Sequence, residues 1–220
     1  MLSPFKTKFI EFMMSADVLR FGEFKTKSGR LSPYFVNTGN YRTGAQLDTL
    51  GRYYAELVKS TVGEEFTAMF GPAYKGIPLA ATTAAALSRE HGIDKPYFFN
   101  RKEVKDHGEG GLFVGYQPQD GDRVIIIEDV ITAGTAIRES MAILSKLDGV
   151  KVAAAFVMVD RCEKGQTEKS AMAEVGEEFG FPVYAVVNVY DIIAYLEGDA
   201  KKRENVQRIK DYLKINGAKE

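Results

Sequence analysis

Apolar positions recur with a helical period at both ends of the first 65 residues, and a different pattern lies between them. Behind a Ser3-Pro4 start, the apolar residues of 5–13 are spaced three to four apart, which predicts a first helix. Over 21–37 the chain changes to short apolar and polar pieces with Gly and Pro, which predicts a small hairpin. Over 47–58 the helical period returns, so a second amphipathic helix is expected.

Beyond residue 65, short apolar runs alternate with helical periods. The apolar runs lie at 68–70, 97–100, 123–127, 152–159 and 183–187. The helical periods lie at 76–91, 135–147 and 171–179, and a charged amphipathic helix closes the chain. Buried strands alternating with helices predict an α/β fold with a mostly parallel sheet covered on both faces. We therefore expect a single domain over 1–220, with a helix-and-hairpin layer at 1–65, an α/β core at 66–200 and a C-terminal helix at 201–220.

Composition narrows the classes of function. The 220 residues include 29 Lys and Arg against 30 Asp and Glu, so the net charge of −1 gives no basic field for nucleic acid or an anionic membrane. One cysteine and two histidines exclude an intramolecular disulfide, a cysteine-cluster metal site and a site of several histidines. The longest apolar run, 152–159, is far shorter than the roughly 20 residues of a membrane span. No signal peptide is recognisable, and a soluble, cytoplasmic protein is predicted.

The most informative stretch is 124–136, where an apolar strand is followed by two adjacent acids and then by small residues that open a helix. Glu128 and Asp129 are placed to accept hydrogen bonds from ribose hydroxyls. The start of the helix offers hydroxyls and backbone amides to a phosphate, from Thr132, Ala133, Gly134, Thr135 and Ala136. Two carboxylates would repel a plain phosphate bound at this turn, whereas a sugar phosphate would place its hydroxyls beside them. An ordinary capped helix after two solvated acids is the alternative.

This stretch resembles the phosphoribosyl diphosphate (PRPP) motif of type I phosphoribosyltransferases. Three more stretches resemble orotate phosphoribosyltransferases in particular: Lys27-Ser28-Gly29-Arg30 with Ser32-Pro33-Tyr34-Phe35, Gly71-Pro72-Ala73-Tyr74-Lys75-Gly76, and the charged segment from Asn100 to Gly110. The resemblance implies the type I phosphoribosyltransferase fold, a mostly parallel central sheet flanked by helices with a small N-terminal helix and hairpin as a hood.

The resemblance also implies a reaction. The 5-phosphoribosyl group of PRPP would pass to orotate, giving orotidine 5′-monophosphate and pyrophosphate in pyrimidine synthesis. Mg²⁺ would be carried by PRPP and pyrophosphate, with no metal ligand from the protein. The enzyme would be a homodimer in which each subunit's lid loop reaches the partner's site. Residues 102–111, rich in charge and glycine, are the candidate for this lid.

Roles carried over by position assign residues to both substrates. The catalytic candidates are Lys102, Lys105, His107 and Asp129. PRPP would also be bound by Lys27, Tyr74, Lys75, Arg101, Glu128, Thr132, Ala133, Gly134, Thr135 and Ala136. Orotate would be held by Lys27, Phe35, Val36, Thr132 and Arg161, with the Arg161 guanidinium forming a two-pronged contact to its carboxylate.

Two alternatives keep the same fold. A purine phosphoribosyltransferase would bind PRPP with a different base, but an anionic base needs the cationic pocket that Lys27 and Arg161 predict. A PRPP-binding regulator without catalysis would need a nucleic-acid surface, which the net charge does not offer globally. A generic nucleotide-binding module is disfavoured because no G-x-G-x-x-G follows a strand.

Overall fold

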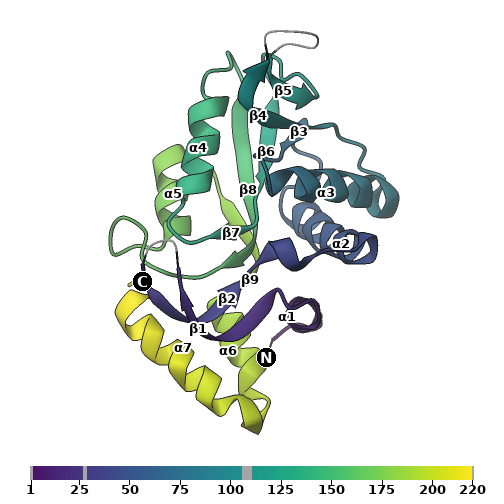
Figure 1. Cartoon of the computed structure of the whole chain (residues 1–220). Coiled ribbons are helices and arrows are strands. Elements are labelled where there is room, and N and C mark those ends of the chain that lie inside the picture. Colours follow the sequence, from purple (N-terminus) through teal and green to yellow (C-terminus); the bar gives the residue numbers. More distant parts are fainter. Residues whose placement is uncertain (1, 27–28, 106–110, 220) are drawn as a thin grey trace.

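The computed structural model describes residues 2–26, 29–105 and 111–219 of the chain. Figure 1 shows a central twisted sheet with helices on both faces and a smaller layer below it. Helices α4 (Thr135–Leu144) and α5 (Ala171–Phe179) lie on one face, and α2 (Gly44–Thr61) and α3 (Gly76–His91) lie on the other. This is the mostly parallel α/β architecture that the alternation of strands and helices predicts.

Within the described part of the chain, the large sheet has seven strands in the order β5-β4-β3-β6-β8-β7, with β9 also paired to β8. The strands are β3 (Ala68–Phe70), β4 (Tyr97–Lys105), β5 (Gly111–Gly115), β6 (Arg123–Ile127), β7 (Val130–Ile131), β8 (Lys151–Asp160) and β9 (Val183–Asn188). All neighbours are parallel except β4 and β5, which are antiparallel. Ligand-binding loops of such a sheet are therefore expected at the carboxyl ends of β3 and β6.

Strand β6 shows why the sheet is buried on both faces. Ile125 and Ile127 belong to the hydrophobic core shared with α2 and α3, whereas Val124 and Ile126 belong to the core on the α4 and α5 side. All four side chains are fully buried. Since alternate residues of a strand point to opposite faces, a continuous apolar run fills both cores at once.

The smaller layer is built around the predicted hairpin, β1 (Leu19–Lys25) paired antiparallel with β2 (Leu31–Val36). Helix α1 (Pro4–Ser15) begins as predicted, with the Ser3 side chain accepting a hydrogen bond from the Lys6 amide. Helix α7 (Arg203–Asn216) packs against β2, so both ends of the chain lie in this layer (Figure 1). None of the helices in the described ranges is long and apolar enough to cross a membrane.

Three elements differ from the sequence prediction. Helix α6 (Val189–Glu197) follows β9 directly and is opened by a capping box between Asn188 and Asp191. Strand β7 is only two residues long and follows the acidic pair. The charged segment expected to be a loop from Lys102 onward continues strand β4 to Lys105, which pairs with Gly111 of β5. Antiparallel pairing with the next strand, β5, gives these polar residues backbone partners, which their composition does not reveal.

Candidate active site

The acidic pair lies at the carboxyl end of β6, in the middle of the sheet. The Glu128 amide donates to the Phe156 carbonyl of β8, and the Tyr54 hydroxyl of α2 donates to the Glu128 carbonyl at 2.6 Å. The Met158 amide then bonds the Asp129 carbonyl, so the backbone of both acids is fixed by the neighbouring strand. The turn that carries the carboxylates is therefore rigid before any ligand binds.

The Asp129 carboxylate collects groups from three separate segments. Its Oδ2 accepts from Lys75 Nζ at 2.9 Å and from Thr38 Oγ1 at 2.8 Å, and its Oδ1 accepts from the Val130 amide at 2.7 Å. Burial opposes ionisation of Asp129, but Lys75 and the hydrogen bonds outweigh it and lower the pKa of this carboxyl. Asp129 is the anionic member of the pair.

The pKa of Glu128 is shifted in the opposite direction from that of Asp129. Its side chain is buried, and its Oε1 accepts a hydrogen bond from the adjacent Asp129 amide at 2.9 Å. Burial, followed by the charge of Asp129, raises the pKa of Glu128 to about 8. The surroundings of the two neighbouring carboxyls thus shift their pKa values in opposite directions.

Residues 132–136 form a turn into the N-terminus of α4. Gly134 has φ of 75° and caps the helix, in a left-handed conformation that glycine adopts without strain. The Arg138 guanidinium donates to the Ala133 carbonyl at 2.7 Å and is itself paired with Glu178 at 2.7 Å, which braces the turn from behind. The residues at the start of α4 line the cavity, where the positive end of the helix is available to an anion.

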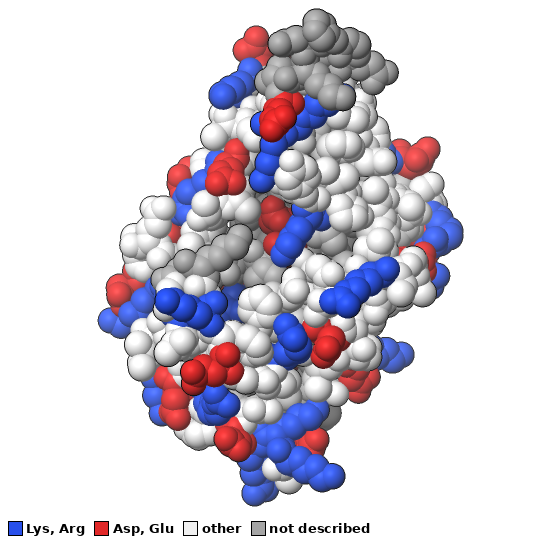
Figure 2. Space-filling model, in the orientation of Figure 1, with Lys and Arg blue, Asp and Glu red and all other residues white. Residues whose placement is uncertain are grey.

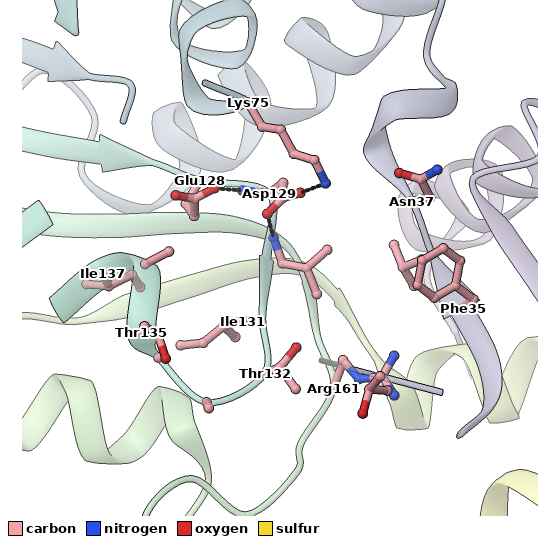
Figure 3. A pocket seen from close by; sticks show the side chains of 16 residues that line it. Phe35, Asn37, Lys75, Glu128, Asp129, Ile131, Thr132, Thr135, Ile137 and Arg161 are labelled. Carbon is pink, nitrogen blue, oxygen red and sulfur yellow. Dashed lines mark hydrogen bonds and ion pairs between the residues drawn. The ribbon is translucent and has the colours of Figure 1, made fainter. Parts of the chain in front are cut away.

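A second turn, 71–76, joins β3 to α3 and supplies Lys75. The buried Asn100 of β4 accepts from the Ala73 amide at 3.0 Å, and the Ala73–Tyr74 peptide bond is cis. A Cβ on Gly71 would lie 2.3 Å from the Gly76 carbonyl oxygen, so the turn is tightly folded on itself. Lys75 extends from this turn across the cavity to Asp129 (Figure 3).

The hairpin and the end of β8 complete the other side of the cavity. Phe35 comes from β2, with its ring stacked on Phe24 at 5.3 Å between centroids. Arg161 follows β8 and is almost fully buried, with its guanidinium 4.2 Å from the centre of the Tyr34 ring. Figure 3 shows Phe35 on the hairpin side of the cavity, and Arg161 at the end where Thr132 also lies.

These residues enclose one cavity of about 480 Å³. Its lining includes many of the residues proposed from the sequence: Phe35, Val36, Lys75, Glu128, Asp129, Thr132, Ala133, Gly134, Thr135, Ala136 and Arg161. It also includes residues that the sequence did not single out: Thr26, Asn37, Val130, Ile131 and Ile137. The parallel sheet thus brings the acidic pair, the helix N-terminus, a lysine and an arginine to a single hollow.

Other predicted residues lie outside this lining. Tyr74 is 68% exposed, and Lys102 lies over its ring at 4.9 Å from Nζ to the centroid. Arg101 donates to the Gly111 carbonyl across the β4–β5 pair at 3.3 Å. Lys27 and His107 fall outside the described residues, and for Lys105 only the backbone, in β4, is described.

Sequence reasoning missed the residues that hold the site rather than line it. Thr38 and Tyr54 contact the acidic turn from the N-terminal layer, and Asn100 holds the 71–76 turn. Each is a common residue type with no spacing pattern of its own. Ser32 and Arg30 were within the hairpin motif, but nothing in that motif indicated what they contact.

The charges on the molecule are mixed. Figure 2 shows basic and acidic side chains interspersed over one face, with both signs meeting in the central hollow. Among the residues that the structure describes, no group of three or more His, Cys, Asp or Glu is placed to hold a metal ion.

Comparison with known proteins agrees with this geometry. The family model for the phosphoribosyl transferase domain matches residues 40–184. The chain is 49% identical to an orotate phosphoribosyltransferase of Clostridium beijerinckii, over 99% of this chain and all of that protein. It is 50% identical to one of Escherichia coli, over 96% of this chain and 97% of that protein. The crystal structure of the orotate phosphoribosyltransferase of Francisella tularensis superposes with a TM-score of 0.84 at 40% identity, covering 96% of this chain and all of that one.

Proposed function

The chain belongs to the orotate phosphoribosyltransferase family and has that family's activity in pyrimidine synthesis, and on this premise we propose how its cavity binds PRPP and orotate and joins them. The observation that carries the assignment of roles is the meeting of Lys75, Thr38 and the start of α4 around Asp129. A sugar with a phosphate at one end and a diphosphate at the other needs this arrangement.

In this proposal PRPP lies across the carboxyl end of β6. Its 5′-phosphate binds the hydroxyls and amides of 132–136 at the positive end of α4. Its ribose hydroxyls bind Glu128 and Asp129, and its diphosphate reaches Lys75 and the amides of the 71–76 turn. Tyr74, Arg101 and Lys27 are further PRPP contacts in the proposal.

Orotate occupies the end of the cavity between Phe35, Val36, Thr132 and Arg161. The Phe35 ring offers an apolar face to the pyrimidine, and Arg161 offers a buried cation to its carboxylate. Lys27, which the sequence places between β1 and β2, is proposed to add a second positive charge. A purine has no carboxylate to satisfy this end of the cavity, so the orotate assignment is favoured over a purine substrate.

The reaction needs little covalent chemistry from the protein. Orotate N1 attacks C1′ of the ribose and gives up its proton to pyrophosphate or to solvent. The bond from C1′ to the diphosphate oxygen breaks, and the electron pair of that bond leaves on pyrophosphate. The protein positions the two anions and balances the charge that develops on the leaving group. Lys75, with Lys102, Lys105, His107 and Arg101, supplies this positive charge, and Mg²⁺ arrives as part of the PRPP complex.

Lys102, Lys105 and His107 are proposed to act from a partner subunit, in a homodimer. Support comes from the family resemblance of 100–110 and from the position of β4 and β5 at the edge of the sheet. The test mixes two inactive variants, Lys105→Ala and Asp129→Asn, after unfolding and refolding together. Recovery of up to about a quarter of wild-type activity is expected, because mixed dimers regain one intact site; no recovery contradicts the shared lid.

The activity itself is tested by following orotate consumption with PRPP and Mg²⁺, with EDTA and hypoxanthine in parallel. Turnover of orotate that EDTA abolishes, with no turnover of hypoxanthine, is the expected result. Turnover of hypoxanthine would favour the purine enzyme. PRPP binding without turnover of either base would favour a regulator on the same fold.

A further inference from the structure

Behind the orotate end of the cavity, two arginines share one buried carboxylate. Glu163 has no exposed side-chain area; its Oε1 lies 2.6 Å from Arg161 Nη2 and its Oε2 lies 2.8 Å from Arg30 Nη1. Arg161 is also buried, whereas Arg30 is partly exposed. The segments are far apart in the chain, since 133 residues separate Arg30 from Glu163.

The contacts of Arg161 show which of its N–H groups already donate within the protein and which remain available to a ligand. Nε donates to Glu163 at 2.7 Å, and Nη2 donates to the same oxygen and to Ser32 Oγ at 2.9 Å. The two hydrogens of Nη1 have no acceptor among the residues that the structure describes. Nη1 is therefore the nitrogen of Arg161 that remains available to the base, and a two-pronged contact through both terminal nitrogens would require Ser32 to be displaced.

Arg30, Arg161 and Glu163 form a cluster whose net charge depends on Arg30. Arg161 and Glu163 alone are a neutral pair, and a neutral pair attracts the carboxylate of a base weakly. Arg30 shares Glu163, so the three side chains carry a net charge of +1 and Arg161 is not fully compensated. Because the cluster is largely buried, this charge is screened less than a surface charge would be.

Arg30 also closes the hairpin turn against the site. The Thr26 amide donates to the Arg30 carbonyl at 2.9 Å, and Arg30 Nη2 donates to the Lys164 carbonyl at 3.3 Å. Thr26 lines the cavity. The arginine thus joins the turn that contains Lys27 in the sequence to the loop that follows β8.

We propose that Arg30 is a specificity-determining residue for the base, acting through Glu163 to orient Arg161 and to keep a net positive charge behind the orotate carboxylate. It is a positioning residue and does not touch the reacting atoms. The inference rests on the proposed orotate site, and it adds to that site a residue outside the cavity lining.

The test compares Arg30→Gln, Arg30→Lys and the control Lys25→Gln in the full-length protein. Lys25 is an exposed lysine on the same hairpin, so its variant loses the same charge without touching Glu163. Arg30→Gln should raise the KM for orotate about tenfold and leave the KM for PRPP within about twofold. Arg30→Lys should fall between wild type and Arg30→Gln, since it keeps the charge but not the second hydrogen bond, and Lys25→Gln should match wild type.

A neutral probe separates charge from general damage to the fold. Orotamide, in which a carboxamide replaces the carboxylate, should inhibit wild type and Arg30→Gln equally. An equal loss for orotamide and orotate, or an unchanged KM for orotate in Arg30→Gln, overturns the inference while leaving the proposed function in place. Absence of orotate turnover by the wild-type protein overturns the proposed function, and the inference with it.

Discussion

Lys75 Nζ lies 2.9 Å from Asp129 Oδ2, so the side chain proposed to bind the diphosphate contacts the side chain proposed to bind the ribose directly across the cavity. Lys75 is 55% exposed at its side chain and Asp129 is 16% exposed. The contact is therefore open to replacement by a substrate that offers phosphate oxygens to the lysine and hydroxyls to the carboxylate.

This contact makes Lys75 a residue to test first. Lys75→Gln should lower kcat/KM for PRPP about 100-fold, because the leaving diphosphate loses a positive charge where negative charge develops. The KM for orotate should change by less than about threefold. Steady-state kinetics with each substrate varied check this, with the exposed Lys59→Gln of α2 as the matched control. A loss in Lys59→Gln equal to that in Lys75→Gln would contradict a local role.

The raised pKa of Glu128 predicts a dependence of stability on pH. The ordinary value is 4.5 and the folded value is about 8, so the folded protein holds this proton more tightly than the unfolded chain does. The contribution of Glu128 to the unfolding free energy is therefore fully present below about pH 4.5 and is lost as the pH rises through about 8. Glu128→Gln, which stays neutral, should gain on wild type by about 3–4 kcal/mol of unfolding free energy between pH 5 and 8.

Urea unfolding at several pH values measures this difference. The control is Glu139→Gln, at an exposed position on α4, for which the difference from wild type should stay constant with pH. A constant difference for Glu128→Gln as well would show that the carboxyl is already ionised throughout the range.

Gly134 is predicted to matter for phosphate binding and not only for helix capping. A Cβ there would lie 2.8 Å from both Arg138 Nη1 and Val175 Cγ2, and φ is 75°. Gly134→Ala should raise the KM for PRPP about tenfold, because the turn that offers its amides must shift. Gly180→Ala is the control, with a similar φ of 74° but open space around its Cβ; it should lose stability and keep the KM for PRPP.

The Tyr54 hydroxyl is predicted to stabilise the acidic turn. It is fully buried and donates to the Glu128 carbonyl at 2.6 Å. Tyr54→Phe should lower the unfolding free energy by about 1–2 kcal/mol, since it leaves a buried carbonyl without this donor. Thermal or urea unfolding checks the value against Tyr53→Phe, at the adjacent half-buried tyrosine. Equal losses in the two variants would mean that the hydrogen bond adds little.

Much of the fold is readable from local pattern. The strand at 123–127 and the helix at 76–91 have the predicted bounds, since an apolar run and a helical period are properties of adjacent residues. Strand β5 and helix α6 were missed for different reasons. Strand β5 depends on pairing with β4, and α6 follows β9 without a turn sequence between them.

The residues of the site also divide into those that local sequence predicts and those that only the packing of distant segments brings together. The residues that offer hydroxyls, amides and carboxylates lie in one continuous stretch, 128–136, whose chemistry can be recognised without the fold. The residues that contact this stretch in the folded protein cannot be recognised from the sequence, because Lys75 is 54 residues from Asp129 and Thr38 is 91 residues from it. Glu163 lies two positions from Arg161 in the sequence, but nothing in the sequence indicates that Arg30 shares it.

The sequence by itself therefore determined the α/β class, the order of most elements and the phosphate-binding and acidic residues. These follow from periodicity and residue type within short windows. Only the tertiary structure decided that Lys75 lowers the pKa of Asp129, that burial raises the pKa of Glu128, and that the buried Glu163 holds Arg161. Such outcomes depend on desolvation and on the distance between charges, and both are set by how distant segments pack together.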